Sequence, residues 1–216
     1  MRIVQASASL VAATFPCRIV EGKVEIQEGS PATIIEDAGR TCYKSEDRIG
    51  PGTAGRFIRR LLDQETPHES VIEHASATFR IVCDRGVSHE LVRHRHTSPS
   101  QESTRYCNYG KDKFNAEITV IEPPDLTPAA RWIWKTVVGV SEWGYMALLR
   151  LGCSPQIARS VLLNSLKTEI VITANFREWR HILRLRTSEQ AHPQAREVAK
   201  LIEPQLKILC PEVFGG

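Results

Sequence analysis

The feature of the sequence that most restricts the fold is a stretch of strict alternation that begins at Ala75. Polar side chains stand at Ser76, Thr78 and Arg80, and small or apolar ones take the positions between them. Successive side chains of a strand point to opposite faces of its sheet, so the pattern predicts a strand with one buried and one solvated face. The buried positions would be Ala75, Ala77, Phe79, Ile81 and Cys83.

Helices are predicted wherever apolar residues recur every three to four positions behind a capping residue or a proline. Residues 53–64 and 87–92 satisfy this spacing, and Thr127 with Pro128 starts a long helix that Gly152 ends. Further helix starts are predicted at Ser154-Pro155, at Asn175 and at His192-Pro193, the last helix being interrupted near Pro204.

Two more strands are predicted, at residues 117–122 and at the β-branched residues 168–173. Residues 97–103 are polar and contain Pro99, so we expect no regular structure there. Strands and helices do not alternate as βαβ units. The sequence therefore predicts one α+β domain over residues 1–216, with helices packed on a small mixed or antiparallel sheet.

Length and composition exclude several classes of protein. A chain of 216 residues with 42% hydrophobic residues is the size and mix of one globular domain. No apolar run reaches the roughly 18 to 20 residues of a membrane span, and residues 1–16 are too polar for a secretory signal. The six cysteines form no CxxC pair, which favours reduced thiols and a cytoplasmic protein. Lys and Arg number 28 against 25 Asp and Glu, so the charge does not demand a nucleic-acid partner.

The densest polar cluster of the chain spans residues 93–106. Arg93, Arg95 and Arg105 offer forks of N–H donors, and the hydroxyl groups between them add further donors. Both kinds of group suit the oxygens of a phosphate. The alternative is a solvated helix end, where basic side chains interact favourably with the helix dipole.

Neither a metal site nor a glycine-loop nucleotide site is favoured. Most of the histidines fall between His68 and His96, but their spacing matches no HExxH or paired Cys/His site, so we expect no metal. The sequence also lacks GxGxxG and GxxxxGK[ST]. Any bound nucleotide must therefore be held by side chains rather than by a glycine-rich loop.

The polar cluster carries a resemblance to a known family. Arg93-His94-Arg95, followed after seven residues by Ser103 and then Arg105-Tyr106, resembles the signature of the flavin-dependent thymidylate synthases. Residues 68–74, 40–43 and 175–186 resemble other segments of that family, so the likeness runs from about residue 35 to about residue 200. The resemblance implies an α+β homotetramer whose active sites form where subunits meet.

The resemblance also implies a reaction and its cofactors. The family converts dUMP to dTMP: NADPH reduces bound FAD, methylenetetrahydrofolate supplies the one-carbon unit, and the reduced flavin supplies the hydride. The resemblance thus implies that the chain binds the small molecules dUMP, folate and NADPH and further copies of itself, and that it binds neither nucleic acid nor a membrane. No cysteine is required as a nucleophile on the uracil, in agreement with the absence of a base-paired cysteine.

Site residues follow from the same resemblance. The residues that would bind FAD are Ser70, Arg93, His94, Arg95, His96, Gln101, Asn175, Arg177 and His181. The residues that would bind dUMP are Glu90, Arg93, Gln101, Glu102, Ser103, Thr104, Arg105, Arg159 and Arg186. Arg186 is the predicted catalytic residue, because it can face a carbonyl of the uracil ring, and His68 would lie near the flavin and folate.

Each of these roles has a simpler alternative. Arg159 could be a surface residue or a partner of Glu169, and Asn175 could be only a helix cap. One solvated helix face could include Arg177, Arg180, Arg184 and Arg186. The sequence also departs from the family pattern, with Ser70 where Thr is frequent, Gln101 where Glu is frequent and Gln190 where His occurs. A phosphate or nucleic-acid binding module, and a flavoprotein of another reaction, remain competing functions.

Overall fold

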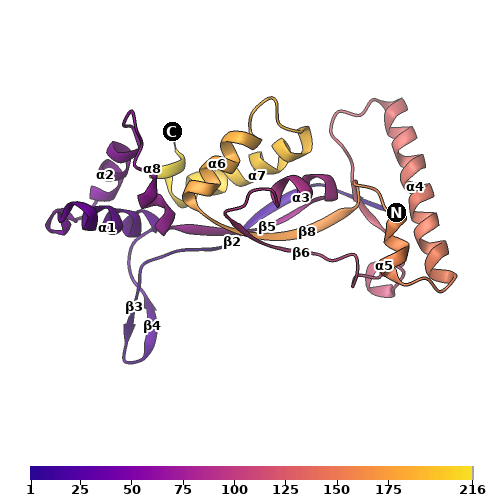
Figure 1. Ribbon diagram of the computed structural model, residues 1–216, viewed down its shortest axis with the longest axis horizontal. Helices are drawn as coiled ribbons and strands as arrows, with labels where there is room; N and C mark the ends of the chain where they lie inside the picture. The colour runs from indigo at the N-terminus through magenta and orange to yellow at the C-terminus, as the bar shows by residue number, and fades with distance from the viewer. Residues whose placement is uncertain (216) are drawn as a thin grey trace.

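A computed structural model describes residues 1–215 of the chain (Figure 1). Its centre is a four-stranded antiparallel sheet of order β2-β5-β8-β6. These strands are Ser7–Ala13, Ser76–Asp84, Lys167–Asn175 and Thr97–Gln101, in the same order. β1 (Arg2–Val4) pairs in parallel with β7 (Thr119–Ile121), and β3 (Cys17–Val20) forms a hairpin with β4 (Lys23–Ile26). The predicted α+β class is confirmed.

Eight α-helices lie around the sheets within the described residues. They are α1 Pro31–Tyr43, α2 Thr53–Leu62, α3 Arg85–Leu91, α4 Pro128–Arg150, α5 Pro155–Ala158, α6 Phe176–Arg186, α7 Pro193–Leu209 and α8 Pro211–Phe214. Short 3₁₀ turns span Glu46–Arg48, Glu69–His74, Asp112–Phe114 and Arg159–Val161. None of the helices within residues 1–215 is both long enough and apolar enough to cross a membrane.

The alternation in β5 has the predicted effect. Phe79 and Ile81 are fully buried, whereas Arg80 on the opposite face is exposed. Trp179 of α6 packs edge-on against Phe79, with ring centroids 5.1 Å apart, and its indole N–H donates to the carbonyl of Ala77 at 3.0 Å. Truncating such a buried indole to alanine costs about 3–5 kcal/mol of stability. This contact therefore fixes α6 against one face of the sheet.

A second, smaller core lies beneath α4. Tyr145 of α4 is fully buried and packs near Tyr109, Val120 and Leu166. In Figure 1 α4 stands at one end of the long axis of the molecule, and α1 and α2 lie at the other end. The main core, under α6 and α7, lies between them.

The helix starts predicted at Thr127 and Asn175 are confirmed. Thr127 caps α4 by accepting a hydrogen bond from the amide of Ala130 at 3.3 Å, and Asn175 caps α6 by accepting one from the amide of Glu178 at 2.9 Å. The helices predicted at residues 53–64 and 87–92 correspond to α2 and α3. Strands β1 to β4 and helix α1 have no counterpart among the elements predicted from the sequence.

The prediction that residues 97–103 lack regular structure is wrong for the first five of them. Thr97–Gln101 forms β6, which pairs antiparallel with β8. The strand lies at the edge of the sheet, where Pro99, opposite Ile172, is tolerated because edge strands do not need every N–H for the ladder. The open edge of β8 thus decides the conformation of a segment whose own composition favours a loop.

The predicted interruption of the last helix near Pro204 is also wrong. α7 runs without a break from Pro193 to Leu209, with Pro204 inside it. A proline within a helix costs about 3 kcal/mol. Ile202 and Leu206 are buried in the main core, and Gln205 binds β2 by accepting from the amide of Leu10 at 2.9 Å. Packing on the sheet offsets the local cost.

Candidate active site

Four of the predicted cofactor residues line one cleft of about 610 Å³ beside the junction of β8 and α6: His96, Asn175, Arg177 and His181. Its other lining residues are Glu69, Glu73, Glu178, Arg180 and Arg184. The volume falls within the range of small-molecule sites. Three arginines, two histidines and an asparagine amide provide many N–H donors for an anionic ligand.

Two of the three cleft arginines are already paired with acidic side chains of the 3₁₀ turn at Glu69–His74. Arg177 lies 2.5 Å from Glu73 and 3.4 Å from Glu69, and Arg180 lies 3.0 Å from Glu69. These pairs are partly or largely exposed to solvent, so each is worth at most about 1 kcal/mol. Such weak pairs can open and free the arginine N–H groups for another anion, but Glu69 and Glu73 line the same cleft and would repel a phosphate placed close to them.

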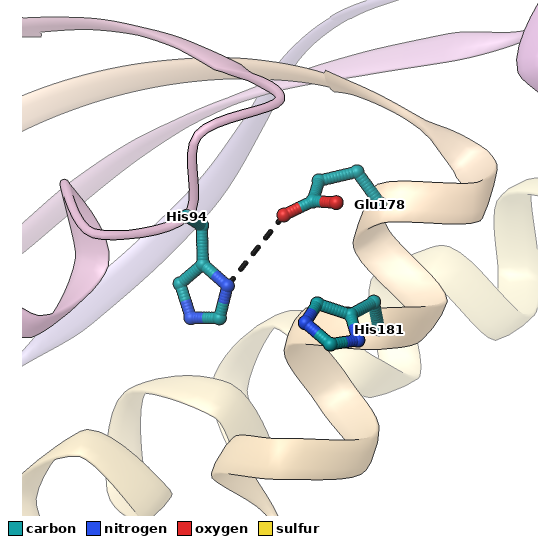
Figure 2. Close-up of side chains that lie close together, drawn as sticks. All are labelled: His94, Glu178 and His181. Atoms are coloured by element: carbon teal, nitrogen blue, oxygen red, sulfur yellow. Dashed lines mark ion pairs between the residues drawn. The ribbon is translucent and has the colours of Figure 1, made fainter.

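His94 lies next to this cleft and is almost completely buried, with 6% of its surface exposed. Its Nδ1 atom lies 3.5 Å from a carboxylate oxygen of Glu178, as Figure 2 shows. Its Nε2 atom lies 3.2 Å from Nε of Arg186, and the ring of His181 meets it edge-on at 5.8 Å between centroids. Burial, together with the charge of Arg186 and the proximity of His181, lowers the pKa of His94 to about 4, so the ring is neutral at pH 7.

Arg186, the last residue of α6, is held by Glu90 of α3 and by His94, which follows α3. Its guanidinium forms an ion pair with the carboxylate of Glu90 in α3, donates to the Glu90 carbonyl at 3.3 Å and donates through Nε to His94. An arginine carries five N–H donors, and these contacts use three of them. Two donors, one on each terminal nitrogen, remain for a ligand.

His94, Glu178 and His181 place their potential metal-ligand atoms within 4.8 Å of one another. Two imidazoles and a carboxylate can bind a transition metal. Here, however, Arg186 donates to one nitrogen of His94 and leaves its proton on the nitrogen that faces Glu178. The arrangement is therefore an imidazole held between a cation and an anion, and a divalent ion beside the guanidinium would be repelled.

Gln101 ends β6, and residues 102–105 follow the strand toward α5, at the Lys167 end of β8 (Figure 1). The two ends of β8, at Asn175 and Lys167, lie about 26 Å apart at the usual rise per residue of a strand. Gln101 points inward and donates to Ser88 at 2.8 Å and to Thr168 at 3.2 Å. The predicted site residues of one chain thus form two groups. The first group lies at the Asn175 end of β8, around the cleft, and the second group lies at the Lys167 end, around residues 101–105.

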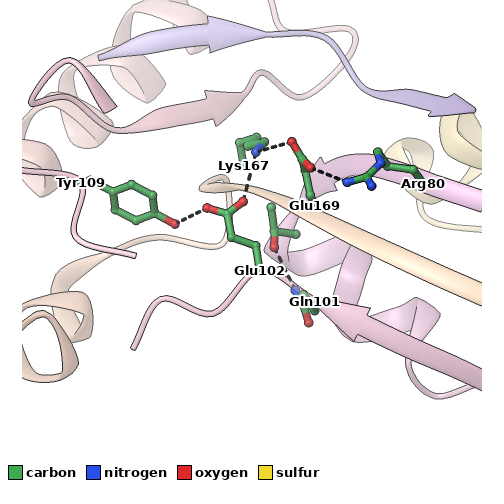
Figure 3. A network of polar contacts seen from close by, with 7 residues as sticks. Arg80, Gln101, Glu102, Tyr109, Lys167 and Glu169 are labelled. Carbon is green, nitrogen blue, oxygen red and sulfur yellow. Dashed lines mark hydrogen bonds and ion pairs between the residues drawn. The ribbon is translucent and has the colours of Figure 1, made fainter. Parts of the chain in front are cut away.

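Glu102 is the centre of a polar network in this second group. Figure 3 shows its carboxylate between the hydroxyl of Tyr109, which donates at 3.0 Å, and Nζ of Lys167, also at 3.0 Å. Lys167 also contacts Glu169 at 3.1 Å, and Glu169 pairs with Arg80 at 3.2 Å. Burial works to lower the pKa of Lys167, but its hydrogen bonds to Glu102 and Glu169 outweigh burial and raise it. Glu102 is therefore engaged within the protomer.

The rest of the second group is more open. Arg159 donates to the hydroxyl of Thr104 at 3.1 Å, and the hydroxyl of Ser103 accepts from the amide of Arg105 at 3.3 Å. The Arg105 guanidinium is exposed and lies over the ring of Tyr106 at 5.6 Å. Within residues 1–215, neither Arg105 nor Arg159 forms an ion pair. The interpretation of Arg159 as a partner of Glu169 is thus wrong, because Lys167 and Arg80 occupy that carboxylate.

The structure leaves three predicted residues outside these contacts. Ser70 is exposed between Glu69 and Glu73, and Arg93 and Arg95 are exposed on either side of the buried His94. None of the three lines the 610 Å³ cleft. Their proposed contacts with cofactor or substrate remain predictions.

Several residues of the site were not predicted from the sequence as ligand contacts. Arg180 and Arg184 follow Arg177 at helical spacing, and Glu178 precedes His181 by one helical turn, so the face of α6 could have indicated them. The pairing of Glu178 with His94 joins distant segments and has no sequence signature.

Comparison with known proteins gives a consistent result. Residues 26–212 match the family described as "Thymidylate synthase complementing protein". A flavin-dependent thymidylate synthase of Corynebacterium glutamicum is 35% identical over 98% of this chain and 90% of its own length. One of Mycobacteroides abscessus is 38% identical over 87% of this chain and 80% of its own. A crystal structure of a UMP/dUMP methylase from Streptomyces cacaoi bound with 5-Br dUMP has the same fold, with a TM-score of 0.79 at 23% identity over 100% of this chain and 96% of that chain.

Proposed function

The chain belongs to the family of flavin-dependent thymidylate synthases, and we propose that it converts dUMP to dTMP as an FAD-dependent methyltransferase. In this proposal NADPH reduces the flavin and methylenetetrahydrofolate donates the one-carbon unit. The observation that carries it is the convergence of Arg186 and His94 beside the cleft at the β8–α6 junction. Two elements far apart in sequence bring together the residues that carry the family resemblance.

The residues of the cleft fit a flavin nucleotide. His96, Asn175, Arg177 and His181 would hold FAD there, with the arginines of α6 facing its phosphates. Arg95 would reach the same ligand from the exposed turn after His94. Bound flavin supplies the hydride of the reaction. The cleft has no glycine-rich loop, so these side chains carry the recognition.

Arg186 is the residue that we expect to activate the pyrimidine. Its two remaining N–H donors can meet a carbonyl oxygen of the uracil ring, where negative charge develops during attack on the one-carbon unit. Guanidinium stays protonated at every working pH, so it stabilises that charge without giving up a proton. Glu90 and His94 hold the guanidinium from two sides, which keeps the donors in place before substrate arrives.

The second group of residues would bind the phosphate of dUMP. Arg105, Arg159 and the hydroxyl groups of Ser103 and Thr104 form an open set of donors. No hydrogen bond or ion pair of residues 1–215 joins Glu90 or Arg186 to Arg105 or Arg159. We propose that a second subunit completes each site, so that the loop at 101–105 serves a neighbouring Arg186.

An exposed apolar face supports assembly into the proposed homotetramer. Trp132 and Trp143 of α4 are each 70% exposed, and Ile133 and Val140 beside them are 56% and 63% exposed. Contiguous apolar surfaces of this kind mark interaction sites.

His68 is the residue that would lie near flavin and folate. Its Nδ1 atom lies 3.2 Å from the hydroxyl of Tyr43, which holds the ring.

The proposal is tested by anaerobic incubation of the purified protein with dUMP, methylenetetrahydrofolate, FAD and NADPH. We expect formation of dTMP and a yellow protein that retains flavin through gel filtration. A colourless protein that binds DNA and makes no dTMP would instead support the nucleic-acid binding module. Retained flavin without dTMP would support a flavoprotein of another reaction.

A further inference from the structure

The carboxylate of Glu178 lies at the wall of the cleft, where little of the residue is exposed, and it has a single side-chain partner. Glu178 is 8% exposed, and among the residues the structure describes its carboxylate is paired only with His94. Its backbone amide is satisfied separately by the Asn175 cap. The capping role therefore does not explain the side chain.

His94 is a bridge between two residues of one helix. Glu178 and Arg186 lie eight positions apart on α6, a separation of about 12 Å along the helix axis. The imidazole fills the space between them, with Nδ1 toward Glu178 and Nε2 toward Arg186 (Figure 2 shows the Glu178 side). His94 itself is fixed by its carbonyl, which accepts from Thr97 at 2.7 Å, and by its amide, which donates to Leu91.

Only one form of His94 agrees with both neighbours. Arginine has donors and no acceptor, so Nε2 of His94 must carry the lone pair that accepts from Arg186. The proton then resides on Nδ1, which lies 3.5 Å from a carboxylate oxygen of Glu178, an ion-pair distance at which the negative charge attracts the N–H group. His181 cannot accept the Nδ1 proton of His94 in place of Glu178, because its own Nδ1 atom already accepts from Arg184 at 3.2 Å. Its ring also meets the ring of His94 edge-on.

We propose that Glu178 is a positioning residue: it holds the proton of His94 on Nδ1 and thereby keeps Nε2 as the acceptor that orients Arg186. Its consequence for turnover rests on the proposed function, in which Arg186 acts on uracil. The opposite tautomer would set the N–H of His94 against the N–H of Arg186 at 3.2 Å, and the guanidinium would have to turn away. The two spare donors would then leave the position in which they meet a substrate carbonyl.

The first test reads the tautomer directly, without cofactor or substrate. We would label the histidines of the full-length protein with ¹⁵N and assign the His94 signals by their loss in His94→Gln. We expect the parent to carry the proton on Nδ1 at pH 7. A parent with the proton on Nε2 would overturn the proposal, whatever the variants do.

Substitutions of Glu178 separate positioning from packing. Glu178→Gln keeps a hydrogen-bond acceptor and should keep the Nδ1 proton, whereas Glu178→Leu removes the acceptor and should move the proton to Nε2. The contact between Nδ1 and the carboxylate is long, at 3.5 Å, so we expect its loss to correspond to about tenfold, the lower end of the range for hydrogen bonds to charged groups. We expect Glu178→Leu to lower kcat for dTMP by at least about tenfold, while the Kd for dUMP changes less than about threefold. Glu203→Gln is the matched control, because it removes a helical carboxylate paired with Lys207 on the surface of α7.

The outcomes decide between the alternatives. An Nδ1 proton in Glu178→Leu, or equal losses of kcat and dUMP affinity, would contradict the proposal. If Glu178→Leu does not fold, Glu178→Gln still decides: an Nε2 proton with undiminished turnover would show that the tautomer does not matter. If the parent makes no dTMP but carries the Nδ1 proton that Glu178→Leu displaces, the proposed function fails and the positioning of His94 stands.

Discussion

Acid should destabilise the protein through His94. The buried ring has a pKa of about 4 in the folded chain, because burial and the neighbouring Arg186 disfavour its charged form, whereas the ordinary value is 6.5. As pH falls below 6.5, the unfolded chain takes up a proton that the folded chain refuses. The contribution of His94 to the free energy of unfolding is therefore complete above pH 6.5. It is lost progressively as the pH falls to about 4, below which His94 is protonated in both the folded and the unfolded chain.

The size of the effect follows from the shift. A difference between 6.5 and about 4 corresponds to about 3 kcal/mol, at 1.36 kcal/mol for each pKa unit. That is a large part of the roughly 5–15 kcal/mol that stabilises a typical domain. His94→Gln provides the reference, because an amide can donate toward Glu178 and accept from Arg186 but does not titrate.

The assay is urea denaturation of the parent and His94→Gln at pH 7 and pH 4. Protomer concentration is kept constant, because assembly contributes to apparent stability. Burial raises the pKa of Asp84, which acts in the opposite direction, but this group is the same in both proteins and cancels in the comparison. The parent should lose about 3 kcal/mol more than the variant between the two pH values. Equal losses would show that His94 is not held neutral by its surroundings.

Three further predictions concern the proposed reaction. Arg186→Lys keeps the charge but loses the planar fork of N–H donors, so the rate of dTMP formation should fall more than the affinity for dUMP. NADPH should still reduce the flavin in this variant, and a defect confined to flavin reduction would contradict the role of Arg186. Arg105→Ala should weaken dUMP binding by about 10- to 150-fold and leave uridine binding unchanged in calorimetry, and equal losses for the two ligands would exclude phosphate as its target. Arg95→Ala should release FAD during gel filtration with dUMP binding largely retained, whereas equal loss of both ligands in an intact assembly would count against that role.

The parts of the fold that could be predicted are those whose cause is local. The alternation of residues in β5 predicts which side chains face the core. The side-chain oxygen of Asn175 predicts the start of α6, because it can cap the first turn of a helix. β6 could not be predicted, because its serines and Pro99 favour a loop and only the open edge of β8 makes it a strand. The unbroken α7 has the same explanation, since packing on β2 and the main core outweighs the local cost of Pro204.

The site divides along the same line. The resemblance indicated His94 and Arg186, because both belong to segments similar to the family. The contact between them depends on the fold, which brings the end of α6 next to the turn after α3. Glu178 was not indicated at all, since a glutamate in the first turn of a helix ordinarily interacts with the dipole and remains solvated. It is the burial of Glu178 and His94 together, which the fold alone determines, that makes this carboxylate specific. Each ring nitrogen of His94 then has one compatible neighbour, and the orientation of Arg186 follows from where the proton of His94 resides.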